Sequence, residues 1–151
     1  MKRLLLVLLS LVVNQAAGQN ITGLWQAGDT VIGSMYREHY IFSAGNKFIY
    51  NTSGYDGLQR VISIGGHYKL VGKTLYLTPE YTVENREGRM ISRSHITTLN
   101  DSWEIEDGTA KTYNIAKPTR ESVSLLLVKR KKGLCLLLNS RPFYFTKGSP
   151  D

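Results

Sequence analysis

The chain is poor in cysteine: Cys135 is the only one among 151 residues. A single cysteine forms no internal disulfide, so a small domain built from this chain must be stabilised by its hydrophobic core. Cys135 lies in the apolar run Leu134-Cys-Leu-Leu-Leu138, where a thiol behaves as a small hydrophobic group with a raised pKa. We therefore expect an inert core residue and not a nucleophile.

Histidine is also scarce, which bears on metal binding and catalysis. His39, His67 and His95 are the only histidines, and a metal site would need at least three ligands that converge. Alternation along the predicted strands places His39 beside Arg37, and His67 beside Lys69 on the solvent side. The chain also lacks a glycine-rich phosphate loop, a serine with an evident base and a pair of carboxylates with informative spacing. We expect no metal, no cofactor and no enzymatic activity.

No apolar run is long enough to span a bilayer as a permanent anchor, which takes about 20 residues. The apolar run over residues 4–13 follows the cationic start Met-Lys-Arg. Ala16 and Gly18 then supply the small side chains that a signal peptidase accepts. The sequence predicts a signal peptide over residues 1–18, cleaved near Gly18, and a single domain over residues 19–151.

A lipoprotein signal would need a cysteine at the cleavage site, and none stands there. We therefore expect no membrane anchor, and a soluble protein that is exported to the periplasm or the extracellular space. The lack of disulfides in an exported domain favours a bacterial source.

Acidic side chains are fewer than basic ones, 12 against 19. Without Lys2 and Arg3 of the leader the balance is 17 against 12, or +5, which is mild for a protein that binds a polyanion. The densest basic run, Lys129-Arg-Lys-Lys132, precedes Gly133 between two apolar stretches and is predicted to be a solvated hairpin turn. No nucleic-acid partner is expected.

The chain is rich in short runs of Ile, Val, Thr, Tyr and Phe, which Gly, Asn or Asp interrupt about every eight to twelve residues. This spacing is typical of an antiparallel barrel or sandwich, and no stretch after the leader has a convincing helical period. We predict an all-β domain of about eight to ten strands, after some runs merge or drop out. The runs are 21–26, 34–43, 47–52, 59–70, 74–78, 81–85, 89–99, 102–106, 110–115, 122–129, 134–138 and 143–146.

Turns are indicated at several points between these runs. Asp107-Gly108 is the strongest, because a tight hairpin needs the positive φ that Asp-Gly adopts at little cost. Ser43–Asn46, Val71–Lys73 and Arg86–Gly88 are further turn candidates. Gly65-Gly66 lies inside a long strand pattern, which predicts a bulge or sharp bend of the kind that helps barrels to close.

Alternation also indicates which side chains point inward. Glu38 is the polar residue that interrupts an aromatic face. If that face is buried, its carboxylate must be paired, with a ligand amine or an internal arginine; a strand end or a bulge would instead turn it to solvent. The nine tyrosines suit an amphipathic ligand and equally suit a filled core. The candidate lining of a cavity is Tyr36, Glu38, Tyr40, Phe42, Phe48, Tyr50, Tyr68 and Trp103.

Two late runs, Leu125–Val128 and Leu134–Leu138, are apolar on both faces. Such strands need a cover on their outer side as well. Either the segment Phe143-Tyr-Phe145 or a second copy of the chain would supply it, so the hairpin over residues 125–138 is a candidate homodimer interface.

Gly23-Leu24-Trp25 resembles the Gly-x-Trp opening of the lipocalins and the wider calycin barrels. The following segments, Tyr40–Phe42, Gly45–Phe48, Gly66–Leu70 and Lys73–Leu77, are similar to the small exported lipocalin-like proteins of bacteria. The resemblance covers roughly residues 20 to 80, and the second half of the chain matches in strand rhythm alone.

The resemblance implies a closed, antiparallel, up-and-down barrel with a cavity for a small hydrophobic molecule. Gly23 and Trp25 would form the structural motif, with Trp25 plugging one end of the core and an arginine packed across it. Arg120, Arg130 and Arg141 each fit that role. Fatty-acid-binding relatives carry a helix pair between the first two strands, and residues 27–33 are too few to hold it.

Two functions follow from these expectations. The first is an exported, lipocalin-like protein that binds a small hydrophobic or amphipathic ligand in its barrel. The alternative is a solid barrel that acts as an interaction module or inhibitor and binds another envelope protein through its loops or outer face. The two differ in whether the barrel is hollow.

Overall fold

The structure is a computed structural model that describes residues 19–28, 37–54, 57–93 and 102–146. These residues form β-strands and turns, with no helix among them. The strands are β1 (Gly23–Ala27), β2 (His39–Ser43), β3 (Lys47–Asn51), β4 (Val61–Val71), β5 (Thr74–Arg93), β6 (Ser102–Asn114), β7 (Glu121–Arg130), β8 (Gly133–Leu138) and β9 (Arg141–Thr146).

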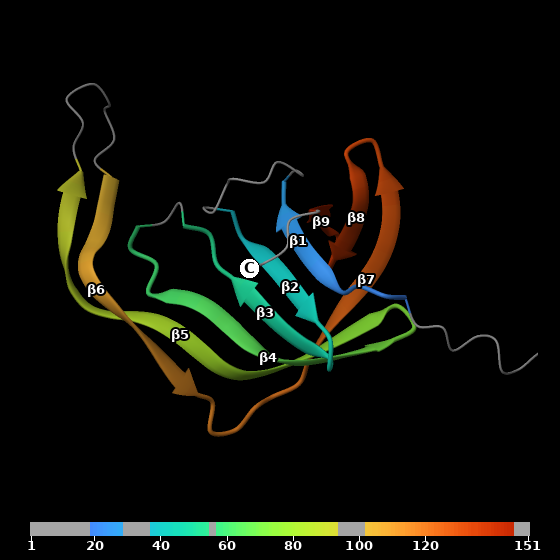
Figure 1. Cartoon of the computed structure of the whole chain (residues 1–151), viewed down its shortest axis with the longest axis horizontal. Helices are drawn as coiled ribbons and strands as arrows, with labels where there is room; N and C mark the ends of the chain where they lie inside the picture. The colour runs from blue at the N-terminus through green and yellow to red at the C-terminus, as the bar shows by residue number, and fades with distance from the viewer. Residues whose placement is uncertain (1–18, 29–36, 55–56, 94–101, 147–151) are drawn as a thin grey trace, which may run out of the picture.

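Eight of these strands close into an antiparallel up-and-down barrel (Figure 1). Neighbours in the wall follow the chain from β1 to β5 and then from β7 to β9. The pairing of β1 with β9 closes the ring. The predicted fold class is confirmed, and the barrel is of the lipocalin or calycin kind. In the part of the chain that the structure describes, no helix is long and apolar enough to cross a membrane.

Strand β5 is 20 residues long and belongs to two structures. Its first half pairs with β4 and β7 in the barrel wall, and the pairing with β4 ends at Glu84. Residues 81–93 pair with β6, which has no other strand beside it among the described residues. We call β6 and residues 81–93 of β5 the arm; it extends away from the barrel at the left of Figure 1.

The hairpin predicted at Asp107-Gly108 and the turn predicted at Arg86–Gly88 were wrong. Both segments lie inside continuous strands, and Glu87 pairs with Gly108 across the arm. Glu87, Gly88 and Asp107 all have positive φ, at 60°, 72° and 58°. These left-handed residues stand opposite one another on β5 and β6. Both strands therefore bend at the same point, and their backbone pairing continues through the bend.

The other turn predictions are confirmed. Residues 44–46 and 72–73 form the turns between β2 and β3 and between β4 and β5. Residues 131–132 form the turn of the β7–β8 hairpin, as the basic run predicted. The β4–β5 register shifts between Gly65 and Gly66, which is the expected bulge.

The core is built from the inward face of the wall, as alternation predicted. Trp25 is 1% exposed, and its Nε1–H donates to the carbonyl of Ile21 at 2.7 Å. A satisfied ring NH allows the whole indole to be buried, which contributes on the order of 2–3 kcal/mol. The buried apolar side chains of this core are Ile21, Trp25, Phe42, Phe48, Leu75, Leu77, Leu125, Leu136, Leu138 and Phe143.

The β7–β8 hairpin is apolar on both faces, as its sequence indicated. Leu125 and Leu136 are buried in the core, whereas Leu126 and Leu134 are 43% and 40% exposed. The segment 143–145 is not an outer cover, because it lies in β9, the next strand of the wall. A dimer through this hairpin stays a prediction.

Candidate functional site

One end of the barrel, which we call the mouth, carries a buried carboxylate. Glu38 directly precedes β2, and its side chain is 11% exposed. Its Oε2 accepts a hydrogen bond from the hydroxyl of Tyr50 at 2.6 Å, and its Oε1 accepts one from Nη2 of Arg141. Of the partners considered from sequence, the structure supplies an internal arginine. A buried carboxylate with two donors is stable in place.

A tight turn delivers Arg141 to the mouth. Asn139 and Ser140 both have positive φ, at 46° and 70°, between the paired residues Leu138 and Arg141. Two consecutive left-handed residues form the two-residue hairpin turn that matches strand twist. An asparagine-led turn between two apolar runs was the sequence signal for this hairpin, and sequence reasoning missed it.

The two tyrosines next to Glu38 are held neutral. Burial, together with the hydrogen bond to Glu38 and its charge, raises the pKa of Tyr50 far above its ordinary value. Burial and the charge of Glu38 raise the pKa of Tyr40. Their rings lie 4.7 Å apart between centroids. The hydroxyl of Tyr50 therefore stays protonated and donates its hydrogen bond to Glu38 at any physiological pH.

A hollow of about 360 Å³ opens beside this cluster. The guanidinium of Arg37 lies against Gly28, and Nζ of Lys132 donates to the carbonyl of Gly28 at 3.3 Å. The side chain of Arg141 is 60% exposed. The rim therefore brings together three cations and one carboxylate. The residues that line the hollow are Ala27, Gly28, Arg37, Glu38, Ser53, Arg141 and Pro142.

Most of the aromatic residues predicted to line a cavity lie together inside the barrel. The ring of Tyr40 is 5.6 Å from that of Phe42, and Phe42 is 5.0 Å from Tyr68. Phe48 is 3% exposed in the same core, and Tyr50 packs against that core as it reaches toward Glu38. These rings contact one another, so the interior next to the mouth is occupied by side chains.

Two members of the predicted lining are not in this group. Trp103 lies on β6, outside the barrel, and is 47% exposed. Trp103 and Glu104 do point to opposite faces of a strand, as alternation predicted. That strand is β6, however, which lies in the arm, so neither of its faces lines the barrel interior. Tyr36 lies outside the described residues.

The Gly-x-Trp segment packs against β9. A Cβ on Gly23, whose φ is 132°, would stand 2.5 Å from Cε2 of Phe145. The rings of Trp25 and Phe145 meet edge to face at 5.3 Å. Arg120 lies over Tyr76 and Arg141 over Phe143. Arg120 and Arg141 therefore lie against other rings and do not take the role expected across Trp25.

No protein family, no curated protein and no solved structure matches this chain. The strand order shows a barrel of the lipocalin or calycin kind.

The two histidines among the described residues, His39 and His67, have different partners. His67 Nδ1 lies 2.7 Å from Oε1 of Glu80 at the surface. His39 contacts the carbonyl of Arg37 and the side-chain amide of Asn51, both at 2.9 Å. His95 lies outside the described residues. Across the described ranges, no group of three or more His, Cys, Asp or Glu side chains is arranged to hold a metal ion.

Proposed function

We propose that this chain is an exported, lipocalin-like binding protein that takes a small amphipathic molecule with an anionic head at the barrel mouth. The observation that carries the proposal is the hollow of about 360 Å³ with Arg37 and Arg141 in its wall. Its volume is at the lower end of the range of small-molecule sites, about 300–1,000 Å³.

The charges at the mouth favour an anionic head over a cationic one. Glu38 already accepts hydrogen bonds from Tyr50 and Arg141, so a ligand amine would have to displace one of them. Arg141 gives one terminal nitrogen to Glu38, and a guanidinium carries five N–H donors in a planar fork. The exposed part of that fork is suited to a carboxylate.

The apolar part of such a ligand would lie on Ala27 and Pro142, which belong to the same hollow. The aromatic rings behind them are packed together, so we place the ligand at the mouth and not deep in the barrel. No group in this arrangement is set up to attack a substrate, and we propose binding without chemistry.

Three probes with the same chain and different heads test the proposal: decanoate, decanol and decylamine, titrated by calorimetry. We expect decanoate to bind tightest, and Arg141→Met to remove its advantage over decanol. Arg130→Met, on the exposed end of β7, is the matched control and should keep the preference. Equal affinity for all three heads would contradict the anionic head, and no binding of any probe would overturn the ligand proposal.

The alternative is an interaction module with a filled barrel. The mutual contacts of Tyr40, Phe42 and Tyr68 favour it, as does an arm that stands away from the barrel wall (Figure 1). Native mass spectrometry of the purified protein separates the two readings, because a co-purified small molecule supports the binder and a clean apoprotein supports the module.

A further inference from the structure

Strand β6 is an open edge in a fold that otherwise closes on itself. It pairs with β5 alone among the described strands (Figure 1). Residues 107–114 are all exposed. β6 has 13 residues, whereas strands in globular proteins have about five or six. A long exposed edge presents backbone donors and acceptors that can pair with another strand.

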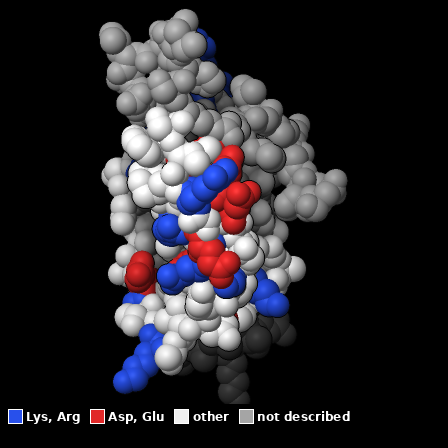
Figure 2. Space-filling model, turned by 90° about the vertical axis from the view of Figure 1, so that its left-hand side faces the viewer, with Lys and Arg blue, Asp and Glu red and all other residues white. Residues whose placement is uncertain are grey.

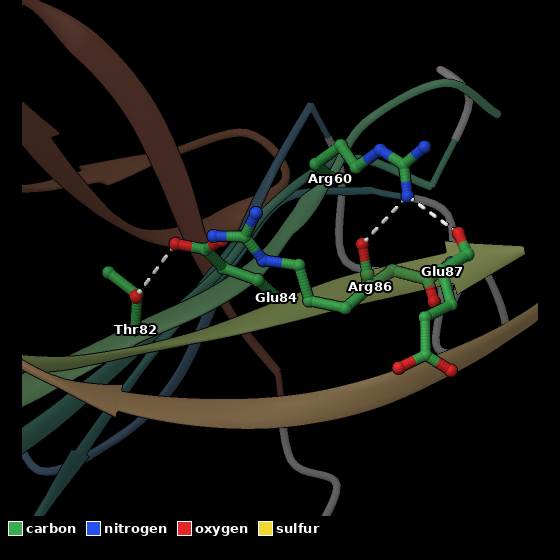
Figure 3. Close-up of polar contacts among 6 residues, drawn as sticks. Arg60, Thr82, Glu84, Arg86 and Glu87 are labelled. Atoms are coloured by element: carbon green, nitrogen blue, oxygen red, sulfur yellow. Dashed lines mark hydrogen bonds and ion pairs between the residues drawn. The ribbon is translucent and has the colours of Figure 1, made fainter.

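Elsewhere along the arm, the chain satisfies its own edge groups. Nη1 of Arg60 donates to the carbonyls of Asn85 and Glu87 at 3.2 and 2.8 Å, just past the point where β4 leaves β5 (Figure 3). The amide of Asn85 donates to the carbonyl of Arg60 at 2.7 Å, and the amide of Ile105 donates to that of Gly57 at 3.0 Å. The open edge over residues 108–114 therefore does not include the backbone groups that Arg60 and Gly57 already bind.

The direction of the free groups follows from one hydrogen bond. The amide of Ile115 donates to the carbonyl of Glu80 at 2.8 Å, so Ile115 faces β5. In an antiparallel ladder, alternate residues turn their N–H and C=O to opposite edges. Ala110, Thr112 and Asn114 consequently direct theirs away from β5, toward the open edge.

The one charged side chain on this edge is already paired. Lys111 is the one charged residue among residues 108–114, and its Nζ is held by Oε1 of Glu87 at 2.6 Å. Arg89 and Glu106 pair at 2.6 Å, and Arg86 and Glu84 at 2.5 Å. Figure 2 shows basic and acidic side chains interleaved on this side of the molecule. The surface therefore has no block of one sign that would repel a copy of itself.

We propose that β6 pairs antiparallel with β6 of a second copy across a two-fold axis at Thr112. In this register Thr112 faces the partner's Thr112, and Ala110 faces the partner's Asn114. Each Lys111 stands opposite the partner's Tyr113, so no like charges face each other directly across the axis. The interface is isologous and closes as a dimer.

The registers centred on Lys111, Ala110 and Thr109, which keep the same hydrogen-bond parity, are worse. An axis at Lys111 places two ammonium groups directly opposite each other, which is destabilising. An axis at Thr109 or Ala110 requires Asp107 or Gly108 to pair as regular strand, and Asp107 is left-handed with φ of 58°. Residues 109–114 lie beyond that kink. This dimer does not depend on the ligand proposed above.

Cysteine cross-linking tests the register, with Cys135 replaced by alanine so that the introduced thiol is the only one. Thr112→Cys places two sulfurs across the axis, about 5.5 Å apart between Cα atoms, which is within disulfide range. Thr109→Cys is the control on the same exposed strand, three residues from the axis. We expect Thr112→Cys to form a disulfide-linked dimer at least tenfold faster; equal rates for the two would overturn the register.

Sedimentation equilibrium tests the dimer itself, with circular dichroism to show that each variant is folded. Thr112→Lys places like charges across the axis and should raise the dimer dissociation constant at least tenfold, whereas Thr109→Lys should not. A chain that stays monomeric at all concentrations would overturn the proposal. A dimer that Leu126→Lys breaks and Thr112→Lys does not would also overturn it, and would assign the interface to the β7–β8 hairpin.

Discussion

Glu38 and Arg141 form an ion pair across 103 positions of the sequence. Glu38 precedes β2 and Arg141 begins β9, and these strands flank β1 on its two sides. The pair therefore stabilises the closure of the barrel, where β1 meets β9, and it also contributes to the charge of the mouth.

Replacing Arg141 by methionine should lower the free energy of unfolding by about 1–3 kcal/mol, because a mostly buried carboxylate loses a charged donor. The exposure of the guanidinium keeps the loss below the 3–5 kcal/mol that is typical of breaking a fully buried pair. Urea denaturation measures the effect. Arg130→Met should change stability by less than about 0.5 kcal/mol, and an equally small effect of Arg141→Met would show that water replaces the pair without loss.

Stability should fall at alkaline pH through Tyr50. Its pKa is raised in the folded protein, so its contribution is fully present below the ordinary tyrosine pKa of about 10 and is lost as the pH rises above that value. Urea denaturation between pH 8 and pH 11 should show the decline, and Tyr50→Phe should make it shallower. Lys111 also has a raised pKa, so an unchanged slope in Tyr50→Phe would assign the decline to other groups.

The two tryptophans differ sharply in burial, since Trp25 is 1% exposed and Trp103 is 47% exposed. Trp25→Ala should lower the free energy of unfolding by about 3–5 kcal/mol, and Trp103→Ala by less than about 0.5 kcal/mol. In fluorescence, the Trp103→Phe variant should emit at shorter wavelength and resist quenching by iodide, and Trp25→Phe should do the opposite. Similar quenching in both variants would contradict the placement of Trp103 outside the barrel.

Two glycines separate backbone strain alone from backbone strain combined with steric overlap. Gly72 has φ of 58° and open space around a Cβ, whereas Gly88 combines φ of 72° with a Cβ 2.6 Å from the carbonyl of Glu106. Gly72→Ala should lower the free energy of unfolding by about 1 kcal/mol, and Gly88→Ala by about 2–3 kcal/mol. A smaller effect at Gly88 than at Gly72 would show that the arm kink relaxes freely.

The barrel was predictable because local signals and global closure agree. Along β2, Tyr40 and Phe42 point inward and Ile41 between them points outward, and turn residues stand at the ends of most apolar runs. The strands and their buried faces can therefore be predicted from the two-residue alternation and from the turn residues. The Gly65-Gly66 bulge was predictable for the same reason, since glycine inside a strand pattern marks a bend.

The arm was not predictable, because turn residues reverse the chain only when no partner strand holds them extended. Asp107-Gly108 alone favours a hairpin, but it stands opposite Glu87 and Gly88, which have the same left-handed preference. The pairing of two such segments is a tertiary relationship. Trp103 was misplaced for a similar reason. It does alternate with Glu104 along a strand, but that strand belongs to the arm, so the face that carries Trp103 does not point into the barrel.

At the mouth, the sequence singled out Glu38 as the polar residue on an aromatic face, and left open both whether its carboxylate points inward and which group would pair with it. Tyr50 was predicted on the same face for its ring, and its hydroxyl became the donor to Glu38. Arg141 was considered as a cover for Trp25 and lies instead against Glu38 and Phe143. Which arginine reaches a buried carboxylate depends on strand order around the ring, which periodicity does not encode.

The pairing of Leu24 with Thr146 also has a kinetic consequence. A chain still being made or threaded through a pore exposes one edge of β1 until β9 emerges, and it cannot complete its wall before then. Because contacts between distant residues form late and slowly, folding should take milliseconds to seconds, and the barrel should close only after the last strand is released. Until that moment the nascent chain is most vulnerable to aggregation through its unpaired first strand.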